Sequence, residues 1–176
     1  RNIVFILYLS TMMIPITVRL IPSYNLCRNL NMLDTYMGMI LPQVAWSIPF
    51  GTFLMRQFYM GIPKQLDEAA KIDGANHFQI FWKILLPNTK SSMTTLGIYT
   101  FISAWNNLIW MLLSVRSESK WTVTLGISSI CGASVIKQPT WNLIMGVIVI
   151  GMIPVLILFF AFQKYFMQSV AATGIK

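Results

Sequence analysis

The chain carries few side chains suited to catalysis, and they are scattered along the sequence. A metal site needs several ligands close together, and a nucleophile needs an adjacent base. His77 is the only histidine, so we interpret it as a helix-surface residue, and Cys27 and Cys131 have neither metal nor redox spacing. No P-loop pattern for binding nucleotide phosphates occurs. We therefore expect a chain that is not an enzyme and holds no metal or cofactor.

Three amide side chains lie inside long apolar segments, where they would be able to contact a solute. Gln43 lies in the second such segment, and Asn106 and Asn107 lie in the third. An unpaired amide in hydrocarbon is costly, so each amide must find a partner. That partner is either a solute crossing the membrane or another helix, with which a hydrogen bond is worth about 0.6–2 kcal/mol. The residues alone leave both interpretations open.

Composition and charge distribution indicate a membrane protein. Hydrophobic residues make up 56% of the chain and charged residues 10%, whereas about a quarter of a soluble domain is charged. The net charge of +8 comes from basic residues spaced singly, which argues against nucleic-acid binding. About 20 apolar residues cross the hydrocarbon core as a helix. We predict an all-α, polytopic transmembrane helical bundle, one membrane domain over 1–176, with spans at about 3–22, 36–55, 93–115 and 141–162.

Prolines and small residues shape the first half of the predicted bundle. Pro15 is expected to kink the first span, and Arg19 to reach the membrane interface. Residues 23–34 are then expected to form a short polar connection. Ser47 and Gly51 are small residues four positions apart, a spacing that favours close packing of the second span on a neighbouring helix.

Residues 56–90 form a charged stretch between two uncharged segments, so we expect them to fold outside the lipid. Pro63 suits the first turn of a helix, and Gly74 can end that helix in a left-handed conformation. Asn76 and Gln79 have the spacing of a capping box and would begin a second helix. The stretch is therefore predicted to be two short helices joined by a tight turn at the membrane surface.

The distribution of basic residues predicts the orientation. Four spans place both ends of the chain on the same side as residues 56–90. Eight of the 13 Lys and Arg residues fall on that side and five on the other. Cytoplasmic segments carry an excess of Lys and Arg, so residues 56–90 are predicted to lie in the cytoplasm.

The same stretch contains the pattern Glu-Ala-Ala, three residues, Gly, nine residues, Ile, one residue, Leu-Pro. This pattern resembles the EAA loop of permease subunits in binding-protein-dependent ABC importers, where the loop docks onto a separate ATPase. Adjacent alanines are expected to leave a helix face bare for docking, and the proline is expected to stop the second helix. The resemblance implies a coupling role for Glu68, Ala69, Ala70, Gly74, Ile84, Leu86 and Pro87.

Further matches extend the resemblance over the whole chain. Permeases of the carbohydrate branch, which includes the maltose and glycerol-phosphate permeases, share its Met13–Ile14–Pro15, Phe101, Trp105–Asn106 and 174–176. Met111 stands where that family usually has a proline that bends the span. The chain begins at Arg1 without an initiator methionine, and the resemblance implies an N-terminally truncated permease of the type I kind, with helices missing before this point.

The function implied by the resemblance is transport of a sugar or related polyol across a bacterial-type cell membrane by a multi-pass permease. The implied partners are a cytoplasmic ABC ATPase, a second permease subunit, and an extracellular or periplasmic solute-binding protein. Two alternatives stay open: a permease for a non-sugar solute, and a membrane scaffold that transports nothing. An intramembrane enzyme is disfavoured, because the span interiors offer amides and hydroxyls but no paired acids or metal ligands.

Overall fold

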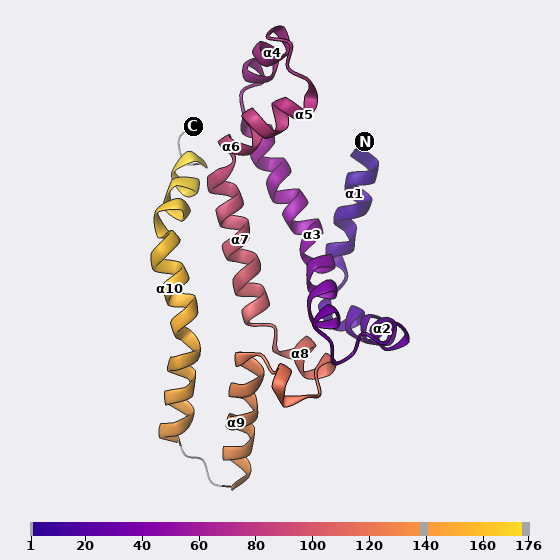
Figure 1. Cartoon of the computed structure of the whole chain (residues 1–176), viewed down its shortest axis with the longest axis vertical. Coiled ribbons are helices and arrows are strands. Elements are labelled where there is room, and N and C mark those ends of the chain that lie inside the picture. The colour runs from indigo at the N-terminus through magenta and orange to yellow at the C-terminus, as the bar shows by residue number, and fades with distance from the viewer. Residues whose placement is uncertain (1, 138–140, 174–176) are drawn as a thin grey trace.

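The computed structural model describes residues 2–137 and 141–173, and every regular element within these ranges is helical (Figure 1). The elements are, in chain order, α1 (Asn2–Ser10), η1 (Thr11–Met13), α2 (Ile16–Asn29), α3 (Tyr36–Gly61), α4 (Lys64–Ile72), α5 (His77–Ile80), η2 (Phe81–Leu85), α6 (Leu86–Asn88), α7 (Lys90–Trp105), α8 (Leu108–Ser114), η3 (Glu118–Lys120), α9 (Val123–Lys137) and α10 (Trp141–Thr173). The predicted all-α class is confirmed. Residues 174–176, on which part of the family resemblance rests, lie outside the described residues.

Length and apolar composition identify the helices that can cross a membrane. Within the described ranges, two helices qualify alone, Tyr36–Gly61 and Trp141–Gln163. Two bent pairs qualify together: Ile3–Met13 with Ile16–Asn29, at 96°, and Lys90–Trp105 with Leu108–Ser114, at 53°. The molecule is thus a transmembrane helical bundle with up to four spans, if each bent pair counts as one.

Three long helices form the body of the molecule (Figure 1). Helix α7 packs between α3 and α10, and α1 lies against α3. The hairpin of α4 and α5 projects from one end, where α1 begins and α10 ends, whereas α2 and α8 lie toward the opposite end. Helix α9 packs along the part of α10 farthest from the hairpin. One end of the bundle therefore carries the hairpin of α4 and α5, and the opposite end carries α2 and α8.

The first predicted span, 3–22, bends more sharply than expected, and its helical structure continues beyond residue 22. The chain turns by 96° between η1 and α2, far more than a proline kink. Ile14 is extended because a residue before proline avoids the helical region, and Pro15 then begins α2 as its N-cap. Helix α2 continues through Pro22 to Asn29, so much of the predicted polar connection 23–34 is helical.

The third predicted span is interrupted rather than continuous. Helix α7 ends at Trp105, and Asn107 caps the start of α8 by accepting a hydrogen bond from the Trp110 backbone N–H at 3.3 Å. The Thr124 hydroxyl donates to the Trp105 carbonyl oxygen, which has lost its helical partner at the break. The bend therefore forms without a proline, because side chains satisfy the backbone groups that the break exposes.

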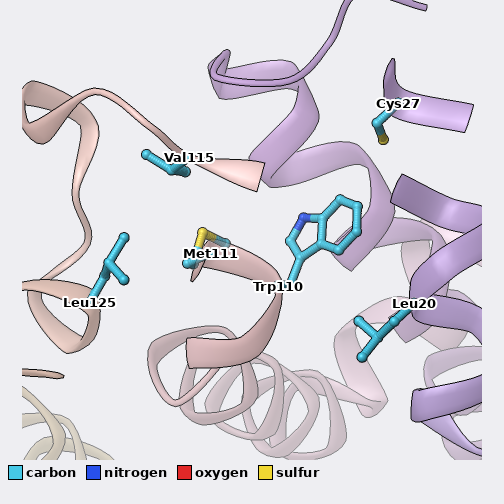
Figure 2. Close-up of a cluster of buried hydrophobic side chains, with 6 residues drawn as sticks. All are labelled: Leu20, Cys27, Trp110, Met111, Val115 and Leu125. Carbon is cyan, nitrogen blue, oxygen red and sulfur yellow. The ribbon is translucent and has the colours of Figure 1, made fainter. Parts of the chain in front are cut away.

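A buried apolar cluster joins α2, α8 and the start of α9 (Figure 2). At its centre the Trp110 side chain is fully buried, and its indole N–H donates to the Gly38 carbonyl oxygen at 3.1 Å. The Trp46 ring meets Trp110 edge-on, with 5.2 Å between ring centroids. The cluster consists of Leu20, Cys27, Trp110, Met111, Val115 and Leu125.

A hydrogen-bonded junction centred on Asp34 joins the α2–α3 turn to the segment after α8. The Asp34 carboxylate accepts from the Arg116 and Ser117 backbone N–H groups, each at 3.0 Å, and from the Ser117 hydroxyl. The Lys120 ammonium donates to the Asp34 carbonyl oxygen, and the Asp34 backbone N–H donates to the Ser114 carbonyl oxygen. The Ser117 hydrogen bonds, with those from Arg116 and Lys120, hold the pKa of Asp34 well below its usual range. The Asp34 carboxylate therefore stays ionised at a lower pH than an ordinary aspartate would.

Small residues permit close contacts between the long helices. A side chain on Gly51 would lie 3.4 Å from Leu96, which places α7 directly against this part of α3. The neighbouring Phe50 and Tyr99 rings lie 4.4 Å apart between centroids. On the other side of the bundle, a Cβ atom on Gly151 would lie 2.4 Å from the terminal methyl of Ile127, which places α9 against this part of α10.

The substitution Gly38→Ala is expected to destabilise the bundle by about 1–3 kcal/mol, the usual cost of an overpacked site. The added Cβ atom would lie 2.0 Å from the Met32 carbonyl oxygen, a backbone atom that cannot rotate away. The measurement is the midpoint of thermal unfolding of the purified protein in detergent. Gly97→Ala is the matched control, because its Cβ meets nothing within 4 Å. Equal midpoints for the two variants would contradict this packing argument.

Candidate functional site

The turn of the hairpin has the conformation that the sequence predicted. Gly74 has a φ of 78°, in the left-handed region. Its N–H donates to the Lys71 carbonyl oxygen at 3.1 Å, and the Ala75 N–H donates to the Ala70 carbonyl oxygen at 2.9 Å. These two bonds form a Schellman motif, which closes the end of α4. A glycine suits this position because it adopts a positive φ without a steric penalty.

The start of the second hairpin helix is also confirmed. The Asn76 side chain accepts from the Gln79 backbone N–H at 2.8 Å, and the Gln79 side chain accepts from the Asn76 backbone N–H at 2.9 Å. This reciprocal pair is a complete capping box. Both ends of the turn are therefore held by hydrogen bonds between residues close in sequence.

The proline at the end of the pattern does not stop the helix. Pro87 lies in the first turn of α6, which continues to Asn88. The preceding segment η2 is a π-helix, in which the Leu86 N–H reaches back five residues to the Phe81 carbonyl oxygen. Proline has no N–H with which to continue the helical ladder, and the wider π turn lets the chain pass this point. The Asn88 amide and the Thr89 hydroxyl donate to carbonyl oxygens of that turn.

The two alanines of the pattern occupy different environments. Ala70 is buried at 7% exposure, whereas Ala69 is exposed. The expected bare face made by both alanines is therefore wrong, because Ala70 is buried and only Ala69 is accessible. Of the other pattern residues, Glu68 and Pro87 are exposed, and Ile84 and Leu86 are partly buried.

Large apolar side chains project from the hairpin into open space. Ile72 is 86% exposed, Phe78 72% and Trp82 52%. A soluble loop seldom leaves such residues uncovered together, and clustered exposed apolar surface marks an interaction site. Near the base of the hairpin, the Phe81 ring lies 6.4 Å from the Tyr59 ring, between centroids. The hairpin is thus exposed at its tip and anchored to the end of α3.

The three amides of the second and third predicted spans line one cavity. A cavity of about 970 Å³ lies between α2, α3, α7 and α8, and Gln43, Asn106 and Asn107 all line it. Its wall also carries the hydroxyl groups of Ser47, Thr100, Ser103 and Thr122. This volume lies within the range of small-molecule sites. Amides and hydroxyls are the groups that exchange hydrogen bonds with a polyhydroxylated solute.

The three amides do not have equal freedom. The Asn107 side chain is already used as the cap of α8. Asn106 is exposed in the cavity wall at the end of α7. The Gln43 Nε2 atom is buried without a hydrogen-bond partner among the described residues. Asn106 and Gln43 are therefore available to a solute, whereas Asn107 has a structural role.

Sequence reasoning missed Arg19 as a member of this cavity. It placed this side chain at the membrane interface, yet the guanidinium carbon lies 5.4 Å from the centre of the Trp46 ring and the residue lines the cavity wall. The signal available in the sequence was a single basic residue in an otherwise uncharged segment. The break before α2 moves it inward, and that break is a feature of the tertiary structure.

Comparison of the sequence with known protein families identifies one that matches nearly the whole chain. The family described as the inner membrane component of binding-protein-dependent transport systems matches residues 1–172. The chain belongs to this family. Its members are transport components of a membrane, which agrees with the apolar helices described above.

Curated relatives extend the comparison. The chain is 39% identical to the sn-glycerol-3-phosphate transport system permease protein UgpE of Yersinia enterocolitica, over 96% of this chain and 59% of the relative. It is 34% identical to the arabinooligosaccharides transport system permease protein AraQ of Bacillus subtilis, over 100% of this chain and 61% of the relative. The chain therefore spans about three fifths of the length of these relatives.

A solved structure shares the fold. A chain in the crystal structure of a bacterial ABC transporter involved in the import of the acidic polysaccharide alginate aligns with a TM-score of 0.64 and 30% sequence identity. The alignment covers 83% of this chain and 55% of that chain. The helical arrangement described above is therefore that of an ABC importer permease.

Paired substitutions separate the two asparagines at the break. Asn107→Leu removes the cap of α8 and is expected to lower the free energy of unfolding by about 0.5–2 kcal/mol. Asn106→Leu is expected to leave stability unchanged and to lower solute uptake severalfold, because it removes a polar group from the cavity wall. The measurements are thermal unfolding in detergent and uptake by vesicles that contain the assembled transporter. A failure of Asn106→Leu to assemble would assign that side chain to helix packing instead.

Proposed function

We propose that this chain is the permease subunit of an ATP-binding-cassette importer that moves a sugar or related polyol across the cell membrane. The observation that carries the proposal is the exposed hairpin of α4 and α5, which bears the Glu-Ala-Ala pattern and lies at one end of a bundle of this family. The relatives are transport permeases for sn-glycerol 3-phosphate and for arabinooligosaccharides, which supports a polyol or sugar as the solute. ATP hydrolysis takes place on a separate chain.

The hairpin docks onto that ATPase in the cytoplasm. Its exposed apolar residues, Ile72, Phe78 and Trp82, enter a groove of the partner. The turn at Gly74 and the capping box at Asn76 keep the hairpin rigid, so that it moves as one body. The contact between Phe81 and Tyr59 passes this movement to the end of α3.

Transport requires two conformations of the bundle, in which the cavity opens to opposite sides of the membrane. Closure of the ATPases on ATP shifts the docked hairpins and switches the cavity between outward and inward access, by rigid-body movement of packed helices. Such coupling requires the hairpin to bind the ATPase differently in the two states. A second permease subunit completes the wall of the cavity, and an external binding protein delivers the solute at the end opposite the hairpin.

The substitution Gly74→Val tests the coupling role against a simple connector or a scaffold. Valine at a φ of 78° is strained by about 1–3 kcal/mol, and relief of that strain would misplace the exposed face of α4. The protein is expected to insert normally, since no span is changed, whereas co-purification of the ATPase and solute uptake fall at least tenfold. Glu68→Lys, on the same helix, is expected to act in the same direction with a smaller effect.

Gly61→Val is the matched control for Gly74→Val. Gly61 also has open space around its Cβ position, but it lies at the end of α3 and has no positive φ. Both uptake and ATPase binding are expected to be near those of the unchanged protein. Normal uptake by Gly74→Val at matched permease levels would refute the coupling proposal.

The orientation of the hairpin is tested by chemical labelling. A single cysteine is introduced as Gln65→Cys, at an exposed position of α4, after Cys27 and Cys131 are replaced by alanine. An impermeant maleimide is expected to label it in inside-out vesicles and not in intact cells. Labelling of intact cells would reverse the proposed topology.

A further inference from the structure

An uncompensated positive charge lines the cavity described above. Arg19, on α2, is mostly removed from solvent, and its Nε atom is buried without a hydrogen-bond partner among the described residues. Among the described residues, the ion pairs are Lys71 with Asp67 and Lys120 with Asp34, and neither includes Arg19. A guanidinium N–H that is buried without a hydrogen-bond partner is unfavourable unless something else satisfies it.

None of the carboxylates in the part of the chain that the structure describes is placed to neutralise this charge. Three of its five acidic residues, Asp67, Glu68 and Asp73, belong to the hairpin at the opposite end. Asp34 is held by Ser117 and Lys120, and Glu118 begins η3, outside the cavity wall. Among the described residues, no carboxylate pairs with Arg19, so an anion from outside the chain could occupy this position.

A second unsatisfied donor lines the same cavity. The Gln43 Nε2 atom is buried and has no hydrogen-bond partner among the described residues. Gln43 and Arg19 come from α3 and α2, and both line the cavity together with Trp46. The Trp46 ring lies over the guanidinium and favours the cation through its face. That contact leaves the N–H groups of Arg19 free to donate.

We propose that Arg19 and Gln43 form an anion-binding subsite, which takes the phosphate or carboxylate group of a polyhydroxylated solute. The edge of a guanidinium that carries Nε offers two parallel N–H donors, the geometry that these groups accept. The Gln43 amide supplies a further donor. The surrounding hydroxyls of Ser47, Thr100 and Thr122 then bind the neutral part of the solute. This inference rests on the proposed import function and specifies its substrate as an anion.

The subsite lies toward the end of the bundle where α2 and α8 meet, away from the hairpin (Figure 1). A solute arriving from the outer side would meet Arg19 early. An attractive charge at the entrance raises the local concentration of anions and repels cations. Arg19 would therefore act in selection of the solute, and the hairpin would be unaffected by its loss.

The test uses the complete transporter, with its second permease, ATPase and binding protein, reconstituted in vesicles. Uptake is measured for matched anionic and neutral probes: sn-glycerol 3-phosphate with glycerol, and an oligogalacturonate with a neutral galacto-oligosaccharide. Arg19→Gln removes the charge and keeps a polar side chain, whereas Arg19→Lys keeps the charge. Arg28→Gln is the matched control, because Arg28 is exposed on the same helix.

The expected result is preferred uptake of at least one anionic probe over its neutral counterpart. Arg19→Gln should lower anionic uptake at least tenfold more than it lowers neutral uptake. Arg19→Lys should retain part of the anionic uptake, and Arg28→Gln should retain all of it. Uptake of neutral probes alone by the unchanged transporter, or equal effects of Arg19→Gln on both classes, would overturn the subsite while the import function stands. Absence of uptake of every probe would refute both proposals.

Two further measurements test whether Arg19 binds a lipid headgroup or the second permease subunit instead of the solute. Vesicles are prepared from phosphatidylcholine with and without phosphatidylglycerol, and a loss in Arg19→Gln that depends on phosphatidylglycerol would assign Arg19 to a lipid headgroup. Co-purification of the second permease is measured in parallel. Its release by Arg19→Gln would assign Arg19 to a carboxylate of that subunit. Either outcome would overturn the solute subsite.

Discussion

The hydrogen bond from the Trp110 indole to the Gly38 carbonyl oxygen holds one end of the bundle together. Trp110 is fully buried, and its N–H has no water to bind, so it must find a partner inside the protein. The bond fixes α8 against the start of α3, and the lack of a side chain on Gly38 allows the close approach to Met32. The Asp34 junction ties the adjoining turns to the segment after α8. The position of the cavity depends on this arrangement, because α2, α3 and α8 all contribute to its wall.

The opposite end of the molecule is stabilised in another way. The hairpin is stabilised by backbone caps within a few residues of Gly74 and Asn76, and its buried side chains are few, chiefly Ala70 and Ile80. A unit that is held by local hydrogen bonds keeps its shape when its surroundings change. The hairpin is therefore stabilised mainly by local hydrogen bonds, whereas the cluster around Trp110 depends on contacts between residues distant in sequence.

Interruptions of helices supply some of the polar groups of the cavity. The break at Asn106 exposes an amide and backbone groups inside an otherwise apolar bundle, and irregular backbone at membrane depth is tolerated only where protein or a water-filled cavity surrounds it. The break at Pro15 turns α2 across the bundle and brings Arg19 into the wall. Both breaks thus place polar groups in the cavity wall and also bend the chain.

The sequence by itself determined the all-α membrane class, the hairpin and its two capped ends. These features depend on apolar run length and on hydrogen bonds between near neighbours, which a local pattern specifies. Only the tertiary structure decided the burial of Ala70, the length of α2, the break at Asn106 and the place of Arg19. Each of these depends on a partner distant in sequence or on the path of another helix, such as the Thr124 hydroxyl that binds the carbonyl oxygen released at the break. Apolar segments carry little periodicity, so their sequence does not specify which face meets which neighbour.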